Sequence, residues 1–168
     1  MVEPWMSGSL TDVHPVPRAL LHSFEQVLLD LRHWTEELSA DQIWACPMGL
    51  GAIGFHLRHI AGSTDRLYTY ARGEALTEGQ LQAMRAEQEP GASCEELLRA
   101  IEAVFQRVGD EVRSIDPAML TEAREVGRKK LPSNVTGLLI HIAEHNLRHV
   151  GEVIITSKVV RAENQRPG

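Results

Sequence analysis

The chain has 168 residues, of which 43% are hydrophobic and 24% are charged. A chain of this length forms one domain with a substantial buried core, and its composition is ordinary for a globular protein. The formal net charge is -6, and the basic run is confined to Arg128, Lys129 and Lys130. Because binding to a phosphate backbone requires a clustered basic face, we expect no nucleic-acid partner.

The sequence also lacks the features of membrane insertion and of export. No stretch is long and apolar enough to span a bilayer. The first residues carry acidic side chains and prolines, where a secretory signal would carry positive charge and then an apolar run. We therefore expect no membrane partner and a cytoplasmic location.

The two cysteines, Cys46 and Cys94, are far apart and belong to no CxxC pair. This usage favours reduced thiols over a disulfide, and neither cysteine fits a zinc ligand set. For Cys46, directly before Pro47, we expect the role of a small buried hydrophobic residue.

Apolar residues recur at helical spacing from the start of the chain. A tail over residues 1–16 precedes a first helix, expected over residues 17–38. After a loop, a second helix is expected over residues 52–71, where Gly73 ends it. The apolar stripe of the first helix comprises Leu20, Phe24, Val27, Leu28, Leu31 and Leu38.

The polar residues 73–92 indicate a long connection that has the length for one short helix. Ser93 then opens a third helix, because Glu96 three residues later completes a capping box. A polar linker over residues 117–132 follows. Either Ser133 or Asn134 caps a fourth helix, which is expected to run to about residue 160.

These elements predict an all-α fold, because no stretch alternates as a strand does. The expected architecture is an antiparallel four-helix bundle over residues 17–162, with a long connection between the second and third helices. A short C-terminal tail, residues 163–168, would follow it. A homodimer is a further expectation. Trp5 and Trp34 are candidate contacts for it, although core packing explains Trp34 more simply.

Five of the eight histidines fall in two clusters. His141, His145 and His149 are spaced by four residues, so they lie on neighbouring turns of one helix, about 6 Å apart along its axis. His56 and His59 lie on the second helix. Neutral imidazole is the commonest protein ligand for zinc and similar ions, so the clusters predict a metal site between two helices. Surface histidines without a ligand are the alternative, which suits an isolated histidine better than three stacked ones.

Helical geometry separates the three C-terminal histidines. His149 lies near the centre of the apolar stripe, His145 about 40° outside it and His141 about 40° further toward solvent. Orientation thus favours His145 and His149 as the inward pair. Glu152 falls between their directions, so it is a candidate ligand or a candidate acceptor that orients an imidazole.

The same segment contains the pattern H-x-x-E-H at His141, Glu144 and His145. In inverted zinc proteases the glutamate of this pattern activates water. Those enzymes require a further carboxylate ligand far downstream, and the chain after His145 is too short to supply one. This argues against a protease of that type.

Two motifs resemble a known family. The first, at residues 54–67, reads Gly-Phe-His-Leu-Arg-His-Ile-Ala-Gly-Ser-Thr-Asp-Arg-Leu and resembles the second-helix motif of the DinB-like proteins, also called the DinB/YfiT superfamily. The second, at residues 144–152, reads Glu-His-Asn-Leu-Arg-His-Val-Gly-Glu and resembles the H-x-x-x-H-x-G-Q signature of that family's fourth helix. The resemblance covers nearly the whole chain after about residue 16.

The resemblance implies an up-down-down-up bundle that holds a divalent metal ion on three histidines. Carried over by position, the ligands are His59, His145 and His149. Periodicity alone would select His56, which lies nearer the apolar centre of its helix than His59, so His56 is the reserve ligand. Glu152 stands where the family signature has Gln, and its role as ligand or hydrogen-bond acceptor stays open.

Three neutral imidazoles leave a divalent ion with open positions, which is typical of catalytic sites. Zinc, nickel and iron all suit such ligands. Among the relatives that the resemblance implies are transferases that use low-molecular-weight thiols, such as bacillithiol or mycothiol, and metal-dependent hydrolases. The leading hypothesis is a thiol-dependent S-transferase that acts on a small electrophile, with residues 73–92 as a candidate lid. The alternatives are a hydrolase of a small molecule and a non-catalytic, stress-associated metal-binding protein.

Overall fold

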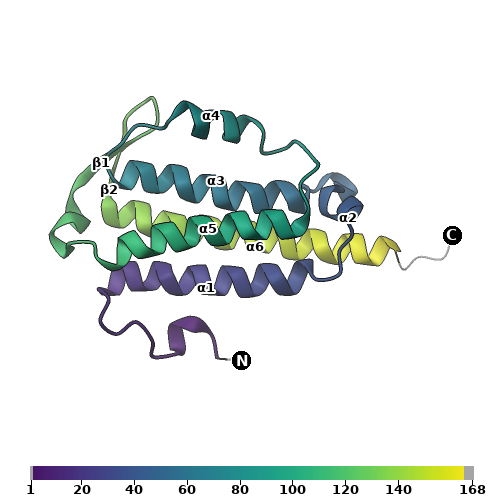
Figure 1. Ribbon diagram of the computed structural model, residues 1–168, viewed down its shortest axis with the longest axis horizontal. Coiled ribbons are helices and arrows are strands. Elements are labelled where there is room, and N and C mark those ends of the chain that lie inside the picture. Colours follow the sequence, from purple (N-terminus) through teal and green to yellow (C-terminus); the bar gives the residue numbers. More distant parts are fainter. Residues whose placement is uncertain (1, 165–168) are drawn as a thin grey trace.

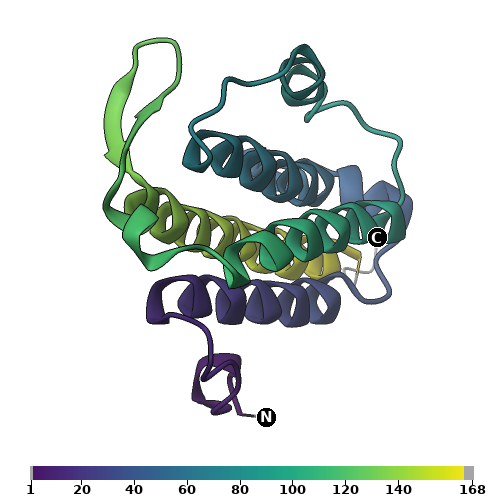
Figure 2. The ribbon, with the colours of Figure 1, turned by 60° about the vertical axis from the view of Figure 1, so that its left-hand side comes forward.

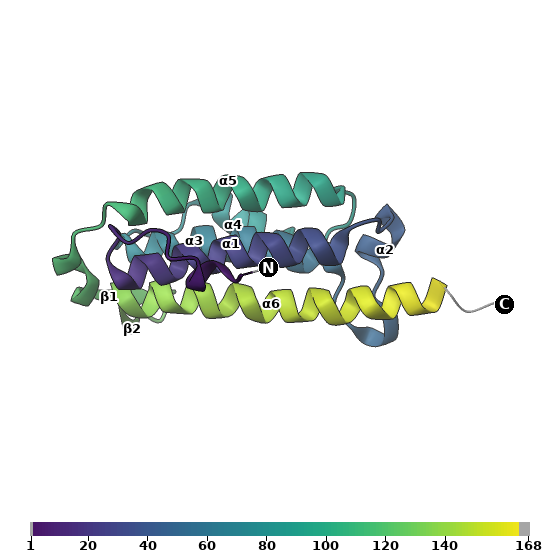
Figure 3. The same ribbon diagram turned by 90° about the horizontal axis from the view of Figure 1, so that it is seen from below.

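Four long helices make up most of residues 2–164, the part of the chain that the computed structural model describes. They are α1 (Pro15–Thr35), α3 (Ile53–Ala71), α5 (Cys94–Arg113) and α6 (Val135–Asn164). α1 contacts α5 and α6, and α3 contacts the same two helices. Figure 1 shows α1 and α6 running in one direction and α3 and α5 in the other. Seen from below, α1 lies between α5 and α6 (Figure 3). The prediction of a mostly helical fold is confirmed.

Short helices lie before α1 and in the connections between the long helices. Among them α4 contacts α3 and lies within the long connection that the sequence predicts. The short elements are η1 (Pro4–Met6), α2 (Ala40–Trp44), η2 (Pro47–Gly49), α4 (Glu78–Arg85) and η3 (Pro117–Thr121).

A β-hairpin occupies the linker before α6, where the sequence predicted no strand. β1 (Ala123–Val126) pairs antiparallel with β2 (Leu131–Asn134), and the pair projects beside the start of α6 (Figure 2). Gly127 begins the turn with φ of 70°, a conformation that glycine adopts without strain. The prediction was wrong because each strand has only four residues, none of them buried, which is too few to show alternation, and Pro132 lies within the second.

Capping side chains fix the ends of the long helices. The Ser93 hydroxyl accepts a hydrogen bond from the Glu96 amide, and the Glu96 carboxylate accepts one from the Ser93 amide, which confirms the capping box. α1 begins two residues earlier than predicted, because the His14 side chain caps it. It also ends earlier, at Thr35, since Glu37 adopts a left-handed φ of 62°.

Of the two candidate caps of the fourth helix, Asn134 accepts a hydrogen bond from the Gly137 amide at 2.7 Å. α6 continues to Asn164, beyond the predicted end. The first two residues of the predicted tail, 163–168, therefore belong to the helix, and residues 165–168 lie outside the described part of the chain.

The core lies between the four long helices. Phe24 of α1 stacks on Phe105 of α5, with ring centroids 3.9 Å apart. Trp34 packs against the core, whereas Trp5 is exposed. The largest fully buried side chains include Leu20, Leu31, Ile43, Ile53, Leu57, Ile60, Ile101, Leu139 and Ile142. Within residues 2–164, no helix combines the length and apolarity needed to cross a membrane.

Both cysteines are free thiols. Cys46 is exposed, so the prediction that it is buried was wrong. It lies directly before η2, in a turn whose inward residue is Pro47. Cys94 is half-buried, and burial raises the pKa of its thiol.

Candidate metal centre

Three histidines from two neighbouring helices converge. His59 extends from α3, and His145 and His149 extend from adjacent turns of α6. One ring nitrogen from each lies within 4.8 Å of the other two. The Nε2 atoms of His59 and His145 are 3.0 Å apart, and the His149 ring centroid lies 4.6 Å from both other rings. Because two nitrogens on one tetrahedral zinc ion lie about 3.3 Å apart, the three imidazoles fit one ion.

The other nitrogen of His59 faces a carboxylate. His59 Nδ1 lies 2.7 Å from Glu87 Oε2, and Glu87 Oε1 accepts a hydrogen bond from Arg66 at 2.7 Å. Burial raises the pKa of Glu87, but the bonds from His59 and Arg66 outweigh it, so the pKa lies below its usual value. An ionised carboxylate accepts a hydrogen bond from Nδ1–H, which leaves the Nε2 lone pair of His59 directed at the cluster.

His56, the reserve ligand, lies behind His149. Its ring is buried, and its Nδ1 is 2.9 Å from Nδ1 of His149. That contact leaves Nε2 of His149 as the nitrogen free to bind a ligand. His56 Nε2 has no partner among the described residues, and a Cβ placed on Gly51 would lie 2.7 Å from it. His56 thus contacts His149 and is not one of the three residues whose ring nitrogens converge.

The remaining candidates lie outside the cluster. Glu152 is exposed, and no hydrogen bond joins it to a histidine among residues 2–164. His141 is also exposed and lies 3.6 Å from Glu144, which pairs with Arg148. Of the H-x-x-E-H pattern, His145 belongs to the three-histidine group found among the described residues, whereas His141 and Glu144 do not.

A family model described as the DinB superfamily matches residues 18–153. The chain belongs to the DinB superfamily. The matched range contains His59, His145 and His149 as well as Glu87. No curated protein matches the chain.

In this DinB-superfamily chain His145 and His149 of α6 are poor bases. Burial, followed by the positive charges of neighbouring histidines, lowers the pKa of His149 to about 3 and that of His145 to about 4. Burial also lowers the pKa of His56. His145 and His149 are therefore neutral at pH 7, and a metal ion does not compete with protons for their lone pairs.

These pKa values predict how the stability of the metal-stripped protein depends on pH. The folded-state values lie below the unfolded value of 6.5, so the unfolded chain binds more protons in acid. The free energy of unfolding should fall as the pH drops from about 6.5 toward 4. Urea midpoints at pH 7.5 and 5 would measure it for the wild type and for the double variant His145→Gln, His149→Gln. Equal losses in both proteins would contradict this assignment.

Contacts around the three histidines of this DinB-superfamily chain stabilise the cluster in ways that the sequence did not predict. Phe55 stacks on His59 with centroids 5.5 Å apart and forms an aromatic wall of the site. Buried Asn146, next to His145, is hydrogen-bonded to Thr64 of α3 at 3.0 Å. That bond fixes how α3 and α6 lie against each other. Glu87 carried no signal in the sequence, because it stands in a polar run with other glutamates.

Proposed function

We propose that His59, His145 and His149 bind one divalent ion, and that the chain is a metal-dependent enzyme that transfers a low-molecular-weight thiol to a small electrophile. The convergence of three imidazole nitrogens within 4.8 Å carries the proposal. Zinc, nickel and iron all suit this donor set. In this proposal the four long helices form an up-down-down-up bundle of the DinB type, and the connection between α3 and α5 covers the metal site.

The ion, held by three protein ligands, would keep positions open and activate a bound thiol or water as a Lewis acid. The chain's own residues supply the setting for this chemistry. His59, His145 and His149 present neutral nitrogens, and Glu87 and His56 engage the rear nitrogens of His59 and His149. Such contacts keep the rings oriented before a ligand arrives.

The polar groups around the cluster favour thiol transfer over hydrolysis. A metal-bound water loses its proton most readily to a general base within reach, in addition to the lowering of its pKa by the ion. The carboxylate that contacts the cluster is Glu87, and both its oxygens are taken by His59 and Arg66. A thiol needs no such base, because its pKa of about 8.5 falls readily beside a cation.

Conjugation assays test this function. The tag-free protein would be loaded with zinc, nickel or iron and mixed with bacillithiol, mycothiol or glutathione and the electrophile monobromobimane. We expect conjugation above the uncatalysed rate, lost with a chelator and restored by metal. His141→Ala is the matched control and should keep the activity, because His141 is exposed and outside the cluster.

Two results would overturn thiol transfer. Cleavage of small esters or amides without conjugation would establish the hydrolase instead. Tight metal binding with neither activity would support the non-catalytic metal-binding protein, acting through a partner or as a homodimer.

A further inference from the structure

We infer that Glu87 is a positioning residue that orients His59 and thereby couples the metal centre to the segment between α3 and α5. The inference rests on the proposed metal-binding role of His59. Glu87 follows α4 (Glu78–Arg85) and belongs to neither helix that carries the three histidines. Its side chain is nevertheless 6% exposed, because it reaches down onto α3.

One face of α3 is shaped to receive this carboxylate. His59 and Arg66 are two turns apart on that face, and each occupies one oxygen of Glu87 at 2.7 Å. Gly62 lies between them. A Cβ on Gly62 would stand 2.7 Å from Glu87 Oε1 and 2.8 Å from Arg66 Nη1. The absent side chain thus leaves the space that the carboxylate fills.

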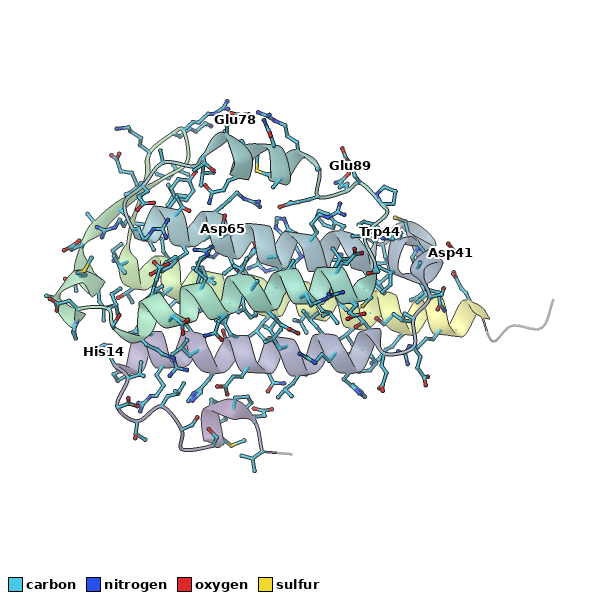
Figure 4. The ribbon with its side chains drawn as sticks, in the orientation of Figure 1. His14, Asp41, Trp44, Asp65, Glu78 and Glu89 are labelled. Carbon is cyan, nitrogen blue, oxygen red and sulfur yellow. The ribbon has the colours of Figure 1, made fainter. Side chains whose placement is uncertain are left out.

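Further contacts dock the same segment onto α3. Arg58 donates to the carbonyl oxygens of Ala86 and Glu89, on both sides of Glu87, and its guanidinium lies 4.9 Å from the Trp44 ring centroid. Figure 4 shows Glu89 and Trp44 at the end of α3 over which this segment passes. Gln80 of α4 donates to Asp65 of α3 at 2.6 Å.

The orientation of His59 by Glu87 and the docking of the segment between α3 and α5 onto α3 are thermodynamically linked. A carboxylate that accepts a hydrogen bond from Nδ1–H fixes the tautomer of a ligating histidine and raises the basicity of its Nε2. Because coupling is reciprocal, metal binding must stabilise the docked segment by the same free energy by which docking favours metal binding. Perturbing the segment therefore weakens metal binding without any change in a ligand.

Metal affinity, measured by competition with a chromophoric chelator, tests the coupling in the full-length protein. Glu87→Gln should lower the affinity about 10- to 100-fold, the range found for such outer partners of histidine ligands. Gly62→Ala should also lower it, although alanine favours a helix, because the added methyl displaces Glu87. Glu89→Gln is the matched control and should bind as the wild type does, since that side chain is exposed.

Two readouts separate positioning from simple support of the fold. Metal should slow hydrogen exchange of residues 86–92 in the wild type and have little effect on it in Glu87→Gln. The ligand-field bands of the cobalt-loaded protein should shift in Glu87→Gln. If both Glu87→Gln and Gly62→Ala kept the wild-type metal affinity and ligand-field bands, the inference about Glu87 would be overturned and the proposed function would not be affected. A wild type that binds no metal would overturn the proposed function as well.

Discussion

Alanine in place of His59, His145 or His149 should lower the affinity for a divalent ion at least about a hundredfold. Structural sites with four protein ligands bind zinc with a free energy of roughly 10–16 kcal/mol, or about 3 kcal/mol for each ligand. Each 1.4 kcal/mol corresponds to a tenfold change in affinity. Competition titration of tag-free proteins would measure the loss. The three variants should behave alike, because one nitrogen from each residue lies within 4.8 Å of the others.

Two other histidines serve as comparisons. His141→Ala should bind as tightly as the wild type, since His141 is exposed and outside the cluster. His56→Ala should lose about tenfold, because His56 contacts Nδ1 of His149 without being a ligand. A loss in His141→Ala as large as that in His149→Ala would contradict the assignment, as would wild-type affinity in any one of the three ligand variants.

Leu139→Ala should lower the free energy of unfolding by about 2–5 kcal/mol, because it leaves a cavity in a fully buried position. The neighbouring residue is a matched control. Ile140 is 57% exposed, so Ile140→Ala should change the stability by less than about 0.5 kcal/mol. Urea unfolding of the metal-stripped proteins would compare them.

This pair tests the rotation of α6 about its axis, which also directs His145 and His149 toward α3. If Ile140→Ala were the more damaging of the two, α6 would be rotated about its axis by about 100°, the angle between consecutive residues of a helix. The histidine cluster would then not form as described.

Periodicity in the sequence predicted the long helices because each carries an apolar stripe, and capping residues marked the starts of α5 and α6. Spacing also identified His145 and His149, since residues four apart lie on one helical face. On the second helix periodicity alone favoured His56, the more buried histidine, whereas the group of three contains His59. The choice of His59 depended on the family motif.

Other features depend on contacts between distant segments. Glu87 reaches His59 only because the connection folds back onto α3, and no local pattern distinguishes it from Glu89. The hairpin between η3 and α6 escaped prediction because its strands are short and contain no buried residue. Cys46 is exposed because its neighbour Pro47 occupies the inward position in the turn.

Anomalous diffraction from a crystal of the metal-loaded protein, at the absorption edge of the metal, would test the metal centre most directly. We predict one peak about 2.0–2.1 Å from a ring nitrogen of each of His59, His145 and His149, with Nε2 of His59 facing the ion and Nδ1 still bonded to Glu87. A peak at another group of side chains, or none between α3 and α6, would contradict the proposed site.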